Sequence, residues 1–91
     1  MRIYREPIVV LFDSQPRQLI WRGRLLVVTH IQGRWFASSP WWSRLPEDAE
    51  AELLVEQETW RVEAGNASSQ GVYELTRTLG QEDWRLQAVM D

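Results

Sequence analysis

Short stretches of alternating apolar and polar residues run through most of this chain, and clusters of turn-forming residues occur between them at short intervals. Because successive side chains of a strand point to opposite faces, this alternation predicts strands with one buried face. About six strands are predicted, at residues 6–12, 17–21, 24–35, 53–64, 71–77 and 84–89. We therefore expect residues 1–91 to form a single, mostly β domain, in which one antiparallel sheet curls into a small barrel or a curled sheet.

Clusters of Gly, Pro, Asn, Asp and Ser mark the ends of the predicted strands. They predict turns at residues 13–16, 22–23, 65–70 and 80–83. The two residues Arg22 and Gly23 indicate either a tight hairpin or a bulge. Residues 37–45 are predicted to form a loop. The proline and acids of residues 46–52 favour one or two helical turns, so the domain is expected to contain at most one short helix.

The long strand at residues 24–35 is predicted to place its side chains in two rows on opposite faces. One row is Leu25, Val27, Thr29 and Ile31, and the other is Leu26, Val28, His30, Gln32 and Arg34. Glycine within a strand often marks a bulge. We expect Gly33 to form one that lets Trp35 or Phe36 turn inward.

Tryptophan and arginine are adjacent four times, at Trp21–Arg22, Arg34–Trp35, Trp60–Arg61 and Trp84–Arg85. In a strand, one member of each pair faces the core and the other faces solvent. Burying an unpaired guanidinium is costly, so we expect the indole to be inside. Trp35, Trp60 and Trp84 are thus predicted core residues.

The outward face of the last three strands is then expected to carry Arg61, Glu63, Glu74 and Arg85. Opposite charges paired across strands stabilise a sheet modestly. The pattern is typical of a solvated ladder of charges. An arginine-lined face that binds a partner is the alternative.

Several classes of function are excluded or disfavoured. The chain has no cysteine, which excludes disulfides, thiolate catalysis and cysteine-bound metals. The single histidine, His30, lies mid-strand without a nucleophile motif, and the acids of residues 47–52 lack the spacing of a calcium loop. We expect no enzyme activity, no metal and no cofactor. Without a signal-peptide pattern or a long apolar stretch, we expect a cytoplasmic protein that does not contact a membrane.

The segment after Pro40 contains the best candidate for a binding site. All ten basic residues are arginines, and the net charge of −3 argues against a general affinity for nucleic acid. Arginines beside aromatic rings are nevertheless what single-strand binders use. The rings of Trp41 and Trp42 either cover the open end of the barrel or form an exposed binding surface. The candidate residues for binding a partner or nucleic acid are Arg34, Trp41, Trp42 and Arg44.

A succession of motifs in this chain resembles a known pattern. The motifs are Trp21-Arg22-Gly23-Arg24, Trp35 with Pro40-Trp41-Trp42, Trp60-Arg61-Val62-Glu63-Ala64, Gly71-Val72-Tyr73-Glu74-Leu75 and Trp84-Arg85-Leu86. Over residues 17–90 this order resembles a family of small, uncharacterised bacterial proteins. It also resembles a region near the C-terminus of ImuB-type mutagenesis factors, which are inactive relatives of Y-family DNA polymerases that act in translesion synthesis.

The chain departs from that pattern in two respects. Residues 45–58 are longer and more acidic than the pattern leads one to expect, and there is no polymerase-like domain or clamp-binding peptide. The resemblance therefore implies an accessory module close to DNA repair or mutagenesis, without implying contact with DNA.

Three functional hypotheses remain open. The leading one is a non-catalytic interaction module that binds a protein partner, such as a polymerase or repair factor, within a bacterial translesion or repair assembly. The second is a single-stranded nucleic-acid-binding domain that stacks bases on its tryptophans and arginines. The third is a structural or self-associating β domain.

Overall fold

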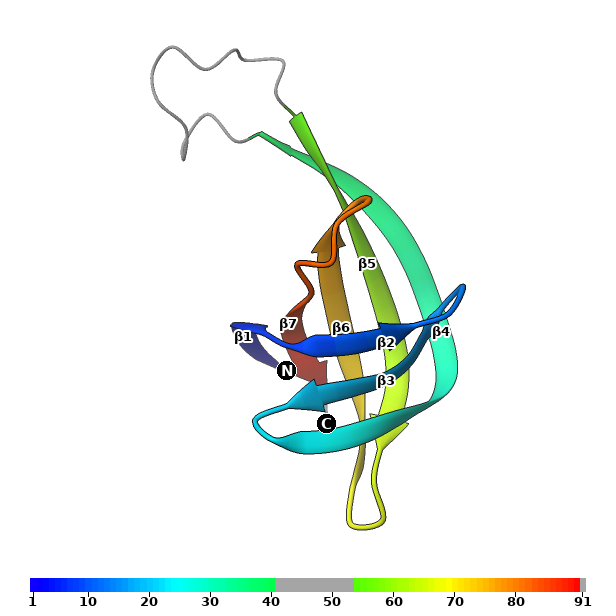
Figure 1. Cartoon of the computed structure of the whole chain (residues 1–91). Helices are drawn as coiled ribbons and strands as arrows, with labels where there is room; N and C mark the ends of the chain where they lie inside the picture. The colour runs from blue at the N-terminus through cyan, green and yellow to red at the C-terminus, as the bar shows by residue number, and fades with distance from the viewer. Residues whose placement is uncertain (41–53, 91) are drawn as a thin grey trace.

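A computed structural model of the protein describes residues 1–40 and 54–90 (Figure 1). These residues form a seven-stranded antiparallel sheet in the order β1-β7-β6-β5-β4-β3-β2. The strands are β1 (Arg2–Pro7), β2 (Val9–Phe12), β3 (Pro16–Trp21), β4 (Arg24–Pro40), β5 (Leu54–Gly65), β6 (Gln70–Thr78) and β7 (Arg85–Met90). The sheet curls strongly into a half-barrel, and the two ranges contain no helix. The predicted all-antiparallel, curled β fold is confirmed. The helix predicted at residues 46–52 lies outside the described residues.

One N-terminal segment supplies both edge strands of the sheet. β1 pairs with β7, β2 pairs with β3, and only Ile8 separates β1 from β2. The backbone N–H of Ile8 donates to the carbonyl of Trp84 at 3.1 Å. The prediction of a single strand at residues 6–12 is therefore wrong. Alternation identifies extended chain, but it does not reveal that the pairing partner changes midway.

The predicted hairpin at Arg22 and Gly23 is confirmed. Trp21 pairs with Arg24, and the two residues between them have φ angles of 53° and 75°. Two-residue hairpins favour positive φ at both positions, because the twist of such a turn matches that of the strands. The turn between β5 and β6 is also confirmed. There the side-chain oxygen of Asn66 accepts hydrogen bonds from the backbone N–H groups of Ser68 and Ser69, at 2.9 and 3.1 Å.

Two bulges interrupt β4 and change which side chains face the core. The register with β5 shifts between Val28 and His30, and again between Ile31 and Gly33. Each extra residue reverses the alternation that follows it. Ile31 therefore packs against the core, whereas His30 is exposed. The expected bulge at Gly33 is present. The prediction that His30 shares a face with Leu26 and Val28 is wrong.

β4 continues as strand beyond the point where a loop was predicted. Ala37 pairs with Gln57, and the ladder extends to Pro40 opposite Leu54. The Ser-Ser-Pro sequence indicates a turn locally, but β5 provides a hydrogen-bonding partner for this backbone. The loop prediction is therefore wrong for residues 37–40, and residues 41–45 lie outside the described ranges.

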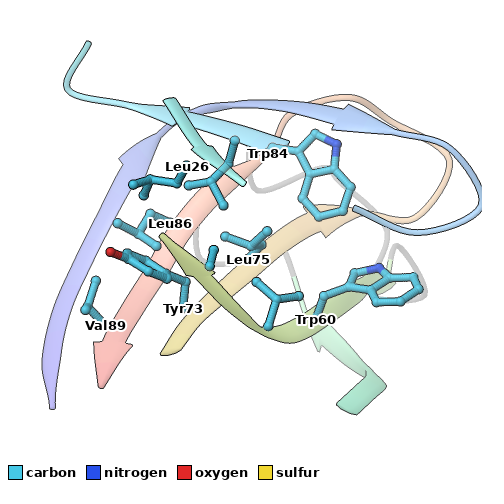
Figure 2. Packing of buried hydrophobic residues seen from close by; sticks show 10 residues of the cluster. Leu26, Trp60, Tyr73, Leu75, Trp84, Leu86 and Val89 are labelled. Atoms are coloured by element: carbon cyan, nitrogen blue, oxygen red, sulfur yellow. The ribbon is translucent and has the colours of Figure 1, made fainter. Parts of the chain in front are cut away.

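The inside of the curl holds the hydrophobic core (Figure 2). Its members alternate along β5 and β6 with outward-facing residues, as the sequence predicts. The core cluster consists of Leu19, Leu26, Trp60, Val62, Ala64, Tyr73, Leu75, Trp84, Leu86 and Val89. Trp60 and Trp84 are 5% and 4% exposed, so the prediction that both are core residues is confirmed.

Candidate functional site

Only one of the four predicted binding residues lies in the described part of the chain. Arg34 is on β4 directly opposite Trp60 of β5, so it shares the inner face of the sheet. Trp41, Trp42 and Arg44 lie outside the described residues.

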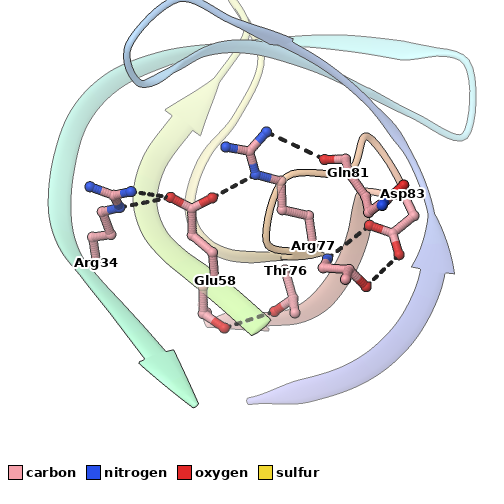
Figure 3. Close-up of polar contacts among 8 residues, drawn as sticks. Arg34, Glu58, Thr76, Arg77, Gln81 and Asp83 are labelled. Carbon is pink, nitrogen blue, oxygen red and sulfur yellow. Dashed lines mark hydrogen bonds and ion pairs between the residues drawn. The ribbon is translucent and has the colours of Figure 1, made fainter. Parts of the chain in front are cut away.

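Arg34 belongs to an ion-pair cluster, the Glu58 cluster, made of Arg34, Glu58 and Arg77 (Figure 3). The side chain of Glu58 is completely buried. Arg34 donates from Nε at 2.7 Å and approaches with Nη2 at 2.5 Å, both to Oε2. Arg77 donates from Nε to Oε1 at 2.5 Å. Both carboxylate oxygens are thus held by guanidinium groups, which compensates the loss of water around a buried charge.

Aromatic rings flank both arginines of the Glu58 cluster. The guanidinium carbon of Arg34 lies 4.9 Å from the ring centroid of Trp60 and 4.8 Å from that of Phe36. The guanidinium carbon of Arg77 lies 4.5 Å from the ring centroid of Phe12 and 4.8 Å from that of Trp84. Cations over aromatic faces gain further stabilisation. The cluster therefore ties β2, β4, β5 and β6 together at one end of the core.

The charge state of Glu58 follows from two opposing effects. Burial raises the pKa of its carboxyl group, but hydrogen bonds and charges from Arg77 and Arg34 outweigh burial and bring the pKa below the ordinary value. Glu58 is therefore ionised at neutral pH. Its negative charge neutralises one of the two arginines beside it.

We expect the stability of the domain to fall in acid partly because of Glu58. Its pKa is lowered on folding, so its contribution is present above the ordinary value of 4.5 and is lost as the pH drops through the folded value. Urea unfolding midpoints measured from about pH 7 to about pH 3 should decline below about pH 4.5. In the Glu58→Gln variant that decline should be shallower. An identical acid decline in wild type and variant would contradict this assignment.

The Arg34–Trp35 pair is oriented opposite to the prediction. Trp35 is 39% exposed and lies on the outer face. Its ring packs over Gly33, 3.6 Å from where a Cβ would stand, with the guanidinium of Arg61 5.4 Å from its centroid. The prediction that Trp35 is a core residue is wrong. It assumed an unpaired guanidinium, and Glu58 supplies the missing partner.

Sequence reasoning overlooked Glu58 and Arg77, although a usable signal was present. Glu58 has the same strand parity as Trp60 and Val62, and Arg77 has the same parity as Leu75. Two opposite charges at inward positions of neighbouring strands indicate a buried pair.

The outward face of β5 to β7 carries the expected charges. Arg61 and Glu74 are register partners, and Nη2 of Arg61 lies 2.6 Å from the carboxylate. Gln32 donates to the side chain of Glu63 at 3.2 Å. This half of the outer surface is polar and internally paired at these positions.

The outer face of β2, β3 and the start of β4 is apolar by contrast. Two rows of paired residues cross it: Val9, Ile20 and Leu25, then Leu11, Gln18 and Val27. The five aliphatic side chains, called here the aliphatic patch, are between 38% and 56% exposed. Of the six positions only Gln18 is polar, and none is charged. A contiguous exposed apolar surface is typical of an interaction site.

The aliphatic patch was also missed from the sequence. Residues 25–28 are all apolar, so both faces of β4 are hydrophobic there. Alternation identifies a buried face by contrast with a polar one, and it does not warn of a second apolar face. The uninterrupted apolar runs at residues 8–12 and 25–28 were the available signal.

Residues 1–40 and 54–90 contain neither a candidate metal cluster nor a helix that could cross a membrane. No group of three or more His, Asp or Glu side chains in these ranges could hold a metal ion. The same ranges include no helix of the length and apolarity needed to cross a membrane.

Comparison with known proteins defines the family of this chain. A family described as a domain of unknown function, DUF6504, matches residues 1–91, so the chain belongs to that family. No curated protein and no solved structure matches the chain.

Proposed function

We propose that this member of the DUF6504 family is a non-catalytic interaction module that binds a protein partner through the aliphatic patch. The exposure of that patch is the observation that carries the proposal. Its aliphatic side chains are 38–56% exposed on the outer face of three neighbouring strands. Single exposed apolar residues are ordinary on protein surfaces, but a contiguous group marks a surface that another molecule covers.

The chemistry of the patch favours protein over nucleic acid. Nucleic-acid affinity comes mainly from cations that contact phosphates. The patch offers no charged side chain, and its single polar group is the amide of Gln18. Aliphatic side chains are suited to the desolvated centre of a protein–protein interface.

Single-stranded nucleic-acid binding stays a prediction. Three of its four residues, Trp41, Trp42 and Arg44, lie outside the described residues. The fourth, Arg34, donates to the buried carboxylate of Glu58. A guanidinium that already neutralises an internal carboxylate has less charge to offer a phosphate.

The resemblance to ImuB-type mutagenesis factors supplies the proposed setting. The motifs that carry it include Trp60-Arg61-Val62-Glu63 and Trp84-Arg85-Leu86. We propose that the partner is a polymerase or repair factor of a bacterial translesion or repair assembly. The domain would contribute a binding surface there and no chemistry of its own.

Affinity capture tests this proposal. Tagged wild-type protein, recovered from cells with damaged DNA, should retain a polymerase or repair factor. The double variant Leu25→Lys/Val27→Lys should retain at least about tenfold less of it, because burying an unpaired ammonium in an apolar interface is costly. Leu79→Lys is the matched control, since Leu79 is 42% exposed but lies in the turn after β6. Equal recovery by both variants would refute a role for the patch.

A further inference from the structure

The second half of β4 has a free edge. β3 pairs with β4 only at residues 24–27, whereas β5 pairs with it as far as Pro40, so β4 continues past the end of β3 (Figure 1). Among the described residues, no strand pairs with this continuation on the side away from β5. Every second residue of a paired strand directs its N–H and C=O away from its neighbour. The edge therefore presents a row of backbone donors and acceptors that no described strand uses.

Residues 34–39, called here the β4 edge, are suited to receive another strand. Both bulges of β4 precede them, so their register with β5 is regular. Trp35 and Phe36 point to opposite faces, and they are 39% and 45% exposed. Edge strands are usually protected by prolines, bulges or outward charges. This stretch contains no proline or bulge, and its one charged residue, Arg34, turns to Glu58.

The Glu58 cluster gives the inner side of the β4 edge an excess of positive charge. Two arginines share one ionised carboxylate there, so one positive charge is left over. Arg34 is the more accessible of the two, because its side chain is 45% exposed and that of Arg77 is 15% exposed. Glu56 is the next acid along β5, and among the described residues it makes no ion pair with either arginine. A strand that passed Arg34 would thus meet a positive charge on the inner face.

We propose that the β4 edge binds an extended segment of a partner protein, whose backbone adds a strand to the sheet and whose acidic side chain lies beside Arg34. A polypeptide in β conformation offers alternating donors and acceptors at the spacing of the edge. Neighbouring strands bring their side chains together on each face, so an apolar side chain of the segment lies beside Trp35. The β4 edge is separate from the aliphatic patch, and this proposal does not rest on the proposed function.

Two other occupants match the β4 edge less well. β4 (Arg24–Pro40) contains no Asp or Glu, so a second copy paired along the same edge would bring Arg34 no carboxylate. It would instead bring a second cluster with the same excess charge, and like charges destabilise a strand pair. A DNA backbone offers acceptors without donors, so it would leave the carbonyl groups of the edge unpaired.

Amide hydrogen exchange of the free protein tests whether the edge is open. About half of the amides at residues 34–39 should exchange rapidly, and the amides between them, which bond to β5, should exchange slowly. Residues 72–76 of β6 are the control, since they pair with β5 and β7 and should all exchange slowly. Slow exchange of every amide at residues 34–39 would mean that the edge is already covered. Rapid exchange of all of them would mean that it is not preformed, and either result overturns the proposal.

Peptides selected on the immobilised protein, from a library of random sequences of about eight residues, identify the segment that the edge accepts. Selected peptides should carry an acid beside apolar residues and should slow exchange of the open amides at residues 34–39. A selected peptide is then N-methylated at alternate positions, in one phase or in the other. One phase should weaken binding at least about tenfold and the other should change it little, because an added strand uses every second N–H. Equal losses in both phases would exclude strand addition. A library that yields no such peptide, or protection of these amides by oligodeoxythymidine instead, would overturn the proposal.

Variants of the protein locate the binding of a selected peptide. Trp35→Ala should weaken it at least about fivefold, because the cross-strand contact on the outer face is lost. Leu79→Ala should not change it, since Leu79 is 42% exposed but lies in the turn after β6. The variant Leu25→Lys/Val27→Lys should also bind the peptide normally. If that variant lost the peptide and Trp35→Ala kept it, the peptide would occupy the aliphatic patch. That result would support the proposed function and overturn strand addition at the β4 edge.

Discussion

Replacing Glu58 with glutamine is expected to lower the free energy of unfolding by about 3 kcal/mol or more. The carboxylate is fully buried and accepts from both Arg34 and Arg77. Glutamine has nearly the same shape but carries no charge. The variant therefore leaves two guanidinium groups close together without the anion between them. Removing one member of a buried ion pair costs far more than the pair itself contributes.

Urea unfolding measures this effect, and two further variants identify its cause. Glu56→Gln changes an exposed acid two residues away on the same strand, and it should cost less than about 0.5 kcal/mol. The triple variant Arg34→Met/Glu58→Met/Arg77→Met should be more stable than Glu58→Gln, because it removes the stranded charges together with their partner. If Glu58→Gln and Glu56→Gln unfold at the same urea concentration, the cluster does not stabilise the fold.

Trp84→Ala is expected to cost about 3–5 kcal/mol, the usual range for a buried tryptophan. Its ring is 4% exposed, and its centroid lies 5.9 Å from that of Phe12 on β2. The guanidinium of Arg77 lies over the same ring at 4.8 Å, and the Trp84 carbonyl accepts from the N–H of Ile8. The loss therefore leaves a cavity where the N-terminal segment meets the end of the sheet.

Trp35→Ala is the matched comparison, because it removes the same side chain from the outer face. Trp35 is 39% exposed, so its loss should cost about 1 kcal/mol or less. Thermal unfolding of both variants measures the difference. Equal losses would mean that Trp35 is a core residue, as its place in the sequence alone had indicated. Near-equality would thus argue against the register of β4.

The parts of the fold that alternation predicts correctly are those in which strands run without interruption. β5 and β6 pair residue for residue from Gln57 to Gly65, and there Trp60, Val62 and Leu75 face inward as expected. Local turn chemistry was equally informative. Arg22 and Gly23 form a two-residue turn, and the formation of such a turn depends only on residues that are adjacent in the sequence.

The errors arose where pairing with distant strands decides the outcome. The first bulge in β4 reverses the alternation and brings Ile31 inside, and the second restores it, so that Arg34 shares the inner face and Trp35 lies outside. Such bulges depend on the partner strand, and local sequence marked only the one at Gly33. Ile8 raises the same difficulty, because the change of partner there is set by β3 and β7.

The candidate site was predictable only in part, for a related reason. Arg34 was identified as a binding residue, but its buried partner Glu58 lies on another strand. The patch depends on three strands whose outward residues are apolar at matching positions, such as Val9 opposite Ile20. The sequence shows that these residues are apolar, but it does not show the strand register that brings them together.

The N-terminal segment that forms both edges of the sheet has a consequence for synthesis on the ribosome. Arg2 pairs with Val89, and Ile3 pairs with Ala88, so the first strand made is completed by the last. During translation β1 has no strand to pair with until β7 has emerged from the ribosome. Contacts between residues so distant in sequence form slowly, since the intervening chain must first be brought together. We expect this domain to complete its fold only after its last strand leaves the exit tunnel, and to need protection from aggregation until then.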